Sequence, residues 1–366
     1  QTYRLDQDLG RFGKIFGRGT YANYTNTNLQ NSDAIPYGLV TFYETEKQWE
    51  VSHTFAIHGN IVNNFRFGYL DAIANEGAPA PSQAQIDALG FQNVFTHFGP
   101  LQASWPGLGF TGYSGWGGSV NAYTASGIPS WEFADSLTIV RGKHTLTTGL
   151  DFRHWVVNRN LDDDFFGDYG FTNDLITVNG TGCATVACGT GNAIGDFLLG
   201  YYQNVGGYIP GPLSPSNVAG NPQSHVYNYL APFVQDDWKV TPRLTLNLGL
   251  RWDYRSVPYE TANKFFWLDV NNPNGGMCFA DQKLLSNGVA PAGNGFFEYC
   301  GRRAPENPGL LKPFAPRIGF AYRPFGGDKT VIRGGYGIYY DSFEAREIDN
   351  SGDFYPYSIR DSLTPA

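Results

Sequence analysis

Four cysteines are the residues of this chain best suited to chemistry, and they fall into two local pairs. Cys183 and Cys188 form one pair and Cys278 and Cys300 the other, each within a stretch rich in glycine and asparagine. Pairs this close in sequence suit disulfides in loops that meet an oxidising compartment. A shared zinc site is the alternative, but the pairs lie 90 residues apart (188 to 278) and neither is a CxxC motif. We therefore expect two local disulfides.

Histidines and aspartates are the other possible metal ligands. The six histidines show no ligand spacing. The densest acidic group, Asp162-Asp163-Asp164 with Asp168, could supply oxygens to a hard cation, but we favour a solvated loop tip. Motifs of metalloproteases, serine hydrolases and P-loop proteins are absent. We expect no catalytic residue, no metal and no cofactor, so an enzyme is not predicted.

Composition narrows the class of protein. Charged residues make up 16% of the 366, below the roughly 25% of soluble domains, while aromatic residues also reach 16%. Mean hydropathy is −0.31, and no apolar run approaches the roughly 18 residues of a transmembrane helix. Such a composition is typical of a transmembrane β-barrel, although a soluble glycine-rich β-protein shares it. The net charge of −8 gives no basic surface for nucleic acid.

The segment 243–255 alternates strictly between apolar and polar or small residues. A strand points successive side chains to opposite faces, so the pattern predicts one apolar and one polar face. Its length suits a tilted strand that crosses a bilayer, which needs roughly 9–11 residues. Val240-Thr241-Pro242 turns the chain from a preceding extended run, so the element is predicted to be a β-hairpin.

Three further hairpins are predicted, and the connections between hairpins are long. Their turns lie near residues 58–60, 141–143 and 324–328. A weaker hairpin at the start of the chain turns at residues 10–13. Irregular stretches are expected at about 71–130, 158–224 and 257–313, with a short helix near 83–89. Short turns alternating with long loops are unusual in compact domains but typical of outer-membrane barrels. We expect a single antiparallel transmembrane barrel region over residues 1–366, with short periplasmic turns and long extracellular loops.

Four segments resemble the barrel of Oar-like TonB-dependent outer-membrane receptors. They are VRGKHTLTTGLDFRH, GNAIGDFLLG, FVQDDWKVTPRLTLNLGLRWDY and FAPRIGFAYRPFGGDKTVIRGGYGIYYD, in the order of that family. The resemblance implies a regulatory-like domain, a plug and a TonB box, which this sequence lacks. It also lacks a signal segment, a terminal aromatic strand and any methionine except Met277. We therefore expect an interior piece of the barrel, with about ten strands.

The alternating strands also predict which side chains meet lipid and which meet the lumen. The lipid-facing candidates are Leu244, Leu246, Leu248 and Leu250. The lumen-facing candidates are Asp151, Arg153, Arg243, Asn247, Arg251, Asp253 and Arg333. The lumen set could line a path for a substrate or contact a plug, or it could only form cross-strand ion pairs that secure the register. Aromatic residues near strand ends are expected at the bilayer interface.

Two functions follow from this reading. The resemblance implies a receptor in the bacterial outer membrane that moves a large nutrient or an exported polypeptide, with the substrate unidentified. Its implied partners are outer-membrane lipid and the TonB energy-coupling complex, reached through parts missing here. The alternative is an adhesin or surface scaffold whose loops bind partners without transport.

Overall fold

The structure is a computed structural model. It describes residues 1–29, 39–77, 82–88, 105–118, 122–124, 127–162, 168–172, 192–200, 202–210, 223–271, 276–281, 297–306, 312–327, 329–340 and 358–363. Almost all of the regular structure is β-strand, so the all-β class predicted from the alternation is confirmed.

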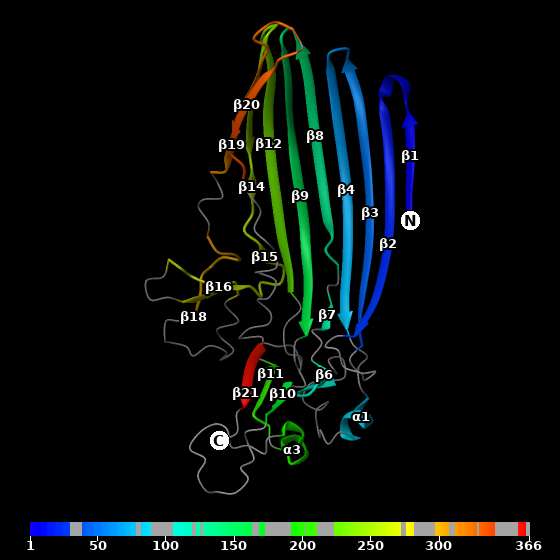
Figure 1. Cartoon of the computed structure of the whole chain (residues 1–366). Helices are drawn as coiled ribbons and strands as arrows, with labels where there is room; N and C mark the ends of the chain where they lie inside the picture. Colours follow the sequence, from blue (N-terminus) through cyan, green and yellow to red (C-terminus); the bar gives the residue numbers. More distant parts are fainter. Residues whose placement is uncertain are drawn as a thin grey trace.

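One large antiparallel sheet, sheet A, contains the long strands that run down Figure 1. β3 has 20 residues, far more than the roughly 5–6 of a typical strand. The short strands β7 (Ala122–Thr124), β14 (Tyr254–Arg255) and β15 (Tyr259–Glu260) pair with the ends of longer ones. The long strands, in spatial order, are β1 (Thr2–Asp8), β2 (Lys14–Leu29), β3 (Leu39–His58), β4 (Ile61–Gly77), β8 (Ser130–Arg141), β9 (His144–Asp162), β12 (Gln223–Thr241), β13 (Leu244–Trp252), β19 (Phe314–Tyr322) and β20 (Ile332–Gly337).

The hairpin turns lie at one end of sheet A, and from the β1–β2 turn to the β12–β13 turn each extends beyond the turn before it. Ile61 at the start of β4 pairs with Ile139, two residues before β8 ends. His144 at the start of β9 pairs with Trp238, three residues before β12 ends. The upper ends of the strands in Figure 1 accordingly rise from β1 to β12. Within the described residues the sheet does not close on itself, and β1 and β20 are its edges.

The register gives sheet A one apolar and one polar face, because residues opposite each other in antiparallel strands share a face. Leu248 of β13, for example, lies opposite Ile318 of β19. The apolar face carries Val51, Phe65, Phe67, Phe133, Leu137, Ile139, Leu150, Phe152, Val234, Leu244, Leu246, Leu248, Leu250, Ile318 and Phe320. The polar face carries Arg18, Glu50, Arg66, Glu132, Asp151, Arg153, Asn247, Arg251 and Arg333.

A smaller sheet, sheet B, lies beyond the ends of the strands opposite the turns (Figure 1). Its strands are β21 (Ser358–Leu363), β11 (Asn204–Pro210), β10 (Asp168–Phe171), β5 (Trp105–Phe110) and β6 (Trp116–Gly118). Leu108, Phe171 and Ala193 form its buried core. Helix α3 (Ala193–Leu198) begins after Asn192, whose side chain accepts a hydrogen bond from the Ile194 amide. None of the helices described, α3 or α1 (Gln83–Ala88), is long and apolar enough to span a membrane.

A third sheet, sheet C, is joined to β12 by buried polar and aromatic contacts. It consists of β16 (Phe266–Leu268), β17 (Met277–Phe279) and β18 (Phe297–Tyr299). The Glu260 carboxylate is buried and accepts hydrogen bonds from the amides of Ala262 (2.7 Å) and Lys264 (2.8 Å). The ring of buried His225, on β12, lies 5.4 Å from that of Phe265. These contacts fix the chain that leads into sheet C.

The three stretches expected to be irregular contain more regular structure than predicted. All strands of sheets B and C lie within these three stretches or within the final residues of the chain. The long strands of sheet A that flank the stretches also extend into them. The predicted helix near 83–89 is confirmed as α1. Alternation could not reveal sheet B because its strands are short and include a parallel pair, β5 with β10, far apart in sequence.

Of the two predicted disulfides, Cys278–Cys300 is confirmed. Cys183 and Cys188 lie outside the described residues, as do Asp163 and Asp164 of the acidic group.

Candidate functional site

Four side chains form a hydrogen-bonded cluster on the polar face of sheet A. Arg251 of β13 lies at its centre. Its Nε is 2.9 Å from Asp253 Oδ1, and its Nη2 is 3.1 Å from Asp151 Oδ2. The same Nη2 donates to the Tyr229 hydroxyl at 2.8 Å. The Tyr229 hydroxyl in turn donates to Asp253 Oδ1 at 2.5 Å. Both Tyr229 and Asp253 are buried, so the charged groups are partly shielded from water.

The order of the strands explains why residues so far apart in sequence meet. β12 lies between β9, which carries Asp151, and β13, which carries Arg251. The β12 residue opposite Asp151 is Ala231, whose small side chain is fully buried. Because Ala231 occupies little volume, the Arg251 guanidinium can reach across β12 to the Asp151 carboxylate.

The ring of Tyr229 is surrounded by positive charge. The guanidinium carbons of Arg153, Arg251 and Arg255 lie 5.7, 5.7 and 5.3 Å from its centroid. Guanidinium groups within about 6 Å of an aromatic face are attracted by the ring quadrupole, by about 0.5–2 kcal/mol depending on exposure. Tyr229 therefore joins the charges of three strands through both its hydroxyl and its ring.

The cluster continues across the sheet as a row of ion pairs that we call the charged belt. Arg153 approaches Glu132 at 3.8 Å, and Glu132 binds Arg66 at 2.8 Å. One strand further on, Arg18 lies 3.8 Å from Glu50. The charged belt thus consists of Arg18, Glu50, Arg66, Glu132, Arg153, Asp151, Arg251 and Asp253.

A hollow of about 770 Å³ lies against the charged belt. Its lining includes Glu50, Arg66, Glu132 and Arg153 of the belt, together with the aromatic side chains of Trp155 and Tyr229. Gly68 also lines it, and a side chain at that position would meet nothing closer than 3.8 Å. The hollow therefore offers both signs of charge and flat apolar surface to a bound molecule.

The structure brings together four of the seven polar residues singled out in the sequence: Asp151, Arg153, Arg251 and Asp253. Asn247 lies on the same face but donates instead to Asp237 Oδ1 at 2.6 Å. Arg333 is also on that face, opposite Ala321 and outside the belt. Arg243 is not in a strand, because β13 begins at Leu244 and Arg243 belongs to the turn.

Sequence reasoning missed half of the belt and its aromatic centre. Arg18, Glu50, Arg66 and Glu132 lie in strands whose alternation is weaker, and Tyr229 shares its face with other large rings. The sequence shows which face of its own strand each of these residues occupies. Which of them are in contact depends on the register between strands, which the sequence does not show.

Asp135 and Asp236 are carboxylates on the apolar face of sheet A, and both are hydrogen-bonded. Asp135 of β8 accepts from Asn63 Nδ2 at 2.7 Å. Asp236 of β12 lies 2.7 Å from His144 Nδ1, and the His144 ring stacks on Trp238 at 5.4 Å. Their register places them on the same face as Leu150 and Leu248.

A sheet of long antiparallel strands, apolar on one face and ion-paired on the other, defines a membrane β-barrel class of protein. The chain matches the family model described as "Outer membrane beta barrel domain" over residues 1–366, and it belongs to this family. It is therefore a protein of the bacterial outer membrane, as its sequence predicted. A comparison with curated proteins gave no match.

The Tyr229 hydroxyl should contribute measurably to stability. Tyr229→Phe removes its two hydrogen bonds to charged groups while keeping the ring, and we expect a loss of about 1.5–3 kcal/mol in the free energy of unfolding. Urea titration of the protein in lipid vesicles measures this. Tyr336→Phe is the matched control, because Tyr336 is 70% exposed, and it should change the value by less than about 0.5 kcal/mol. Equal effects of the two substitutions would contradict the role given to Tyr229.

Proposed function

We propose that the apolar face of sheet A contacts lipid and that the polar face with the charged belt lines the interior of the barrel. The support is energetic. Unpaired charge on a lipid-facing surface is costly, whereas an aqueous interior accepts the belt without desolvating all of it. Leu244, Leu246, Leu248 and Leu250 remain the predicted lipid-facing residues. The polar candidates other than Arg243, which lies in the turn, remain predicted to face the interior.

Aromatic residues on the apolar face support this orientation. Trp131 of β8 contacts Tyr69 (4.3 Å between centroids), Phe67 (5.9 Å) and Trp49 (6.1 Å). Trp131 lies ten residues from Arg141 at the turn end of the same strand. Ten residues of a strand tilted by 35–45° rise roughly 25 Å, which is the height of the apolar band in such barrels. Tryptophan and tyrosine at this height suit the interface between lipid tails and water.

Within this orientation, we propose that the protein is a transporter of the TonB-dependent receptor type, similar to Oar-like receptors. It would move a large nutrient or an exported polypeptide, with energy supplied by a TonB complex. The observation that carries the proposal is the hollow of about 770 Å³ beside the charged belt. A recess lined by both charged and aromatic residues provides a place where a substrate can bind during passage.

An adhesin or surface scaffold is the second candidate. Sheet B favours it, because it lies beyond the ends of the long strands opposite the short turns, which is the extracellular end of a barrel of this kind (Figure 1). A scaffold uses such outer structure to bind partners and needs no path through the interior.

The orientation predicts a depth-dependent penalty at Leu248. Leu248→Arg places a charge on the apolar face near mid-strand, and we expect it to cost about 2–4 kcal/mol of folding free energy in lipid. Thr245→Arg, on the polar face of the same strand, is the control and should cost less than about 0.5 kcal/mol. Reversible unfolding in vesicles measures both. A Leu248→Arg penalty no larger than that of Thr245→Arg would reverse the assignment of the faces.

Transport is tested in a strain that lacks the gene. We expect the deletion to abolish uptake of at least one class of labelled nutrient, from a panel of peptides and oligosaccharides, or the release of an extracellular polypeptide. Gly68→Trp should fill the hollow and lower the restored rate by about tenfold, equivalent to about 1.4 kcal/mol. Gly59→Trp, in an open turn, should restore the full rate. Unchanged uptake and unchanged release in the deletion strain would favour the scaffold.

A further inference from the structure

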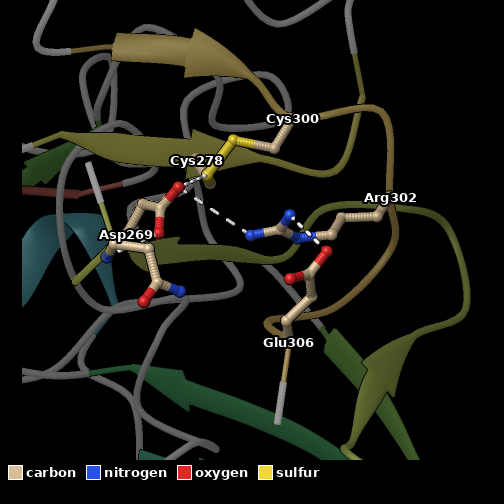
Figure 2. The surroundings of a disulfide bond; sticks show 6 residues. Asp269, Cys278, Cys300, Arg302 and Glu306 are labelled. Atoms are coloured by element: carbon tan, nitrogen blue, oxygen red, sulfur yellow. Dashed lines mark hydrogen bonds and ion pairs between the residues drawn. A yellow bond between two sulfur atoms is a disulfide. The ribbon is translucent and has the colours of Figure 1, made fainter. Parts of the chain in front are cut away.

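A second group of side chains able to do chemistry lies in sheet C, apart from the charged belt. The sulfur atoms of Cys278 and Cys300 are bonded to each other, and the carboxylates of Asp269 and Glu298 lie close to both. One oxygen or sulfur atom from each of these four residues lies within 4.8 Å of all the others. Figure 2 shows the Asp269 carboxylate directed toward the disulfide.

The backbone of sheet C, and not the disulfide alone, holds the four residues together. Cys278 of β17 lies directly opposite Glu298 of β18 in a parallel pair. The Asp269 amide donates to the Gly276 carbonyl at 2.8 Å, which closes the hairpin between β16 and β17. Arg303 then ties the segment after β18 back to the start of the loop, with Nε 2.6 Å from Asn263 Oδ1. The cluster therefore keeps its framework when the sulfur–sulfur bond is broken.

Two thiolates and two carboxylates form a donor set suited to Zn²⁺, which accepts sulfur and oxygen ligands in a tetrahedron. Zinc bonds of about 2.0–2.3 Å place the ligand atoms roughly 3.3–3.8 Å apart. Contracting from 4.8 Å needs only small side-chain rotations, and the two sulfurs separate once they are no longer bonded. Cys278 is fully buried, so water competes weakly for a metal at this position.

The Asp269 carboxylate accepts a hydrogen bond from the Asn271 amide at Oδ1 (3.0 Å), and the neighbouring arginine holds its Oδ2 only loosely. Arg302 Nη1 lies 2.9 Å from Glu306 Oε1, whereas its Nη2 lies 3.8 Å from Asp269 Oδ2 (Figure 2). Arg302 is thus held more closely by Glu306. Its positive charge also offsets part of the negative charge that two thiolates and two carboxylates would leave around a divalent ion.

We propose that reduction of the Cys278–Cys300 disulfide converts this cluster into a Zn²⁺ site. Two molecules of a thiol reductant donate two electrons and two protons to the disulfide, and they leave as their own disulfide. The two cysteine thiols then release two protons as Zn²⁺ binds their sulfurs together with Asp269 and Glu298. Sheet C is closed by a covalent bond in the oxidised protein and by a metal ion in the reduced one.

Co²⁺ is the spectroscopic probe for this site. The full chain with Cys183→Ser and Cys188→Ser, folded in detergent micelles, is reduced with dithiothreitol and freed of reductant without oxygen. We expect stoichiometric Co²⁺ to produce sulfur-to-cobalt charge-transfer absorption and the visible bands of tetrahedral Co²⁺, both lost when Zn²⁺ is added. The oxidised chain should show neither. Asp269→Asn with Glu298→Gln should weaken Zn²⁺ binding by about tenfold or more, because half of the ligands change.

Controls separate metal binding from a general loss of structure. Glu46→Gln, a carboxylate of β3 in sheet A, should leave the Zn²⁺ affinity unchanged. Titration of free thiols verifies reduction, and the heat-dependent shift in gel mobility verifies the folded barrel. The proposal is overturned if the reduced, folded chain shows no charge-transfer band. Unchanged affinity in the Asp269→Asn/Glu298→Gln variant also overturns it, as does collapse of sheet C on reduction without metal binding.

Discussion

Register between strands is the constraint on which the rest of this structure depends. Each long strand of sheet A alternates apolar and polar residues, and a slip of one residue would move a whole row of side chains to the opposite face. The hydrogen-bonded ladders keep Leu248 opposite Ile318. They also keep Arg251 of β13 on the strand next to β12, which carries Ala231. Separation of the faces, the ion pairs of the belt and the hollow beside them all follow from that alignment.

Much of sheet A could be predicted from the sequence, because alternation is a local signal. The hairpin turns, the apolar leucines of β13 and the polar character of Arg251 and Asp253 were visible in this way. Which charges meet was not visible, since Asp151 and Arg251 are 100 residues apart and a third strand separates them. The register of two strand pairs has to be known before their contact can be deduced.

The strands of sheets B and C could not be predicted from alternation, for a different reason. Their strands are short, so each presents too few residues for a period to emerge. In sheet C the signal was chemical instead: the local spacing of Cys278 and Cys300 predicted the bond, although not the carboxylates beside it. Asp269 directly follows β16 and Glu298 stands on β18, and only the pairing of β17 with β18 brings Glu298 close.

The stagger of the hairpin turns has a consequence for depth. From the β1–β2 turn to the β12–β13 turn, each turn lies further along than the one before. A plane parallel to this row of turns therefore crosses sheet A diagonally, shifting by about one to two residues per strand. Positions on the same ladder rung are therefore not level with each other. Asp135 and Asp236 lie four rungs apart, yet this tilt brings them about two residues nearer in height. The carboxylates of Asp135 and Asp236, each hydrogen-bonded, therefore lie nearer to a common layer than their ladder rungs indicate.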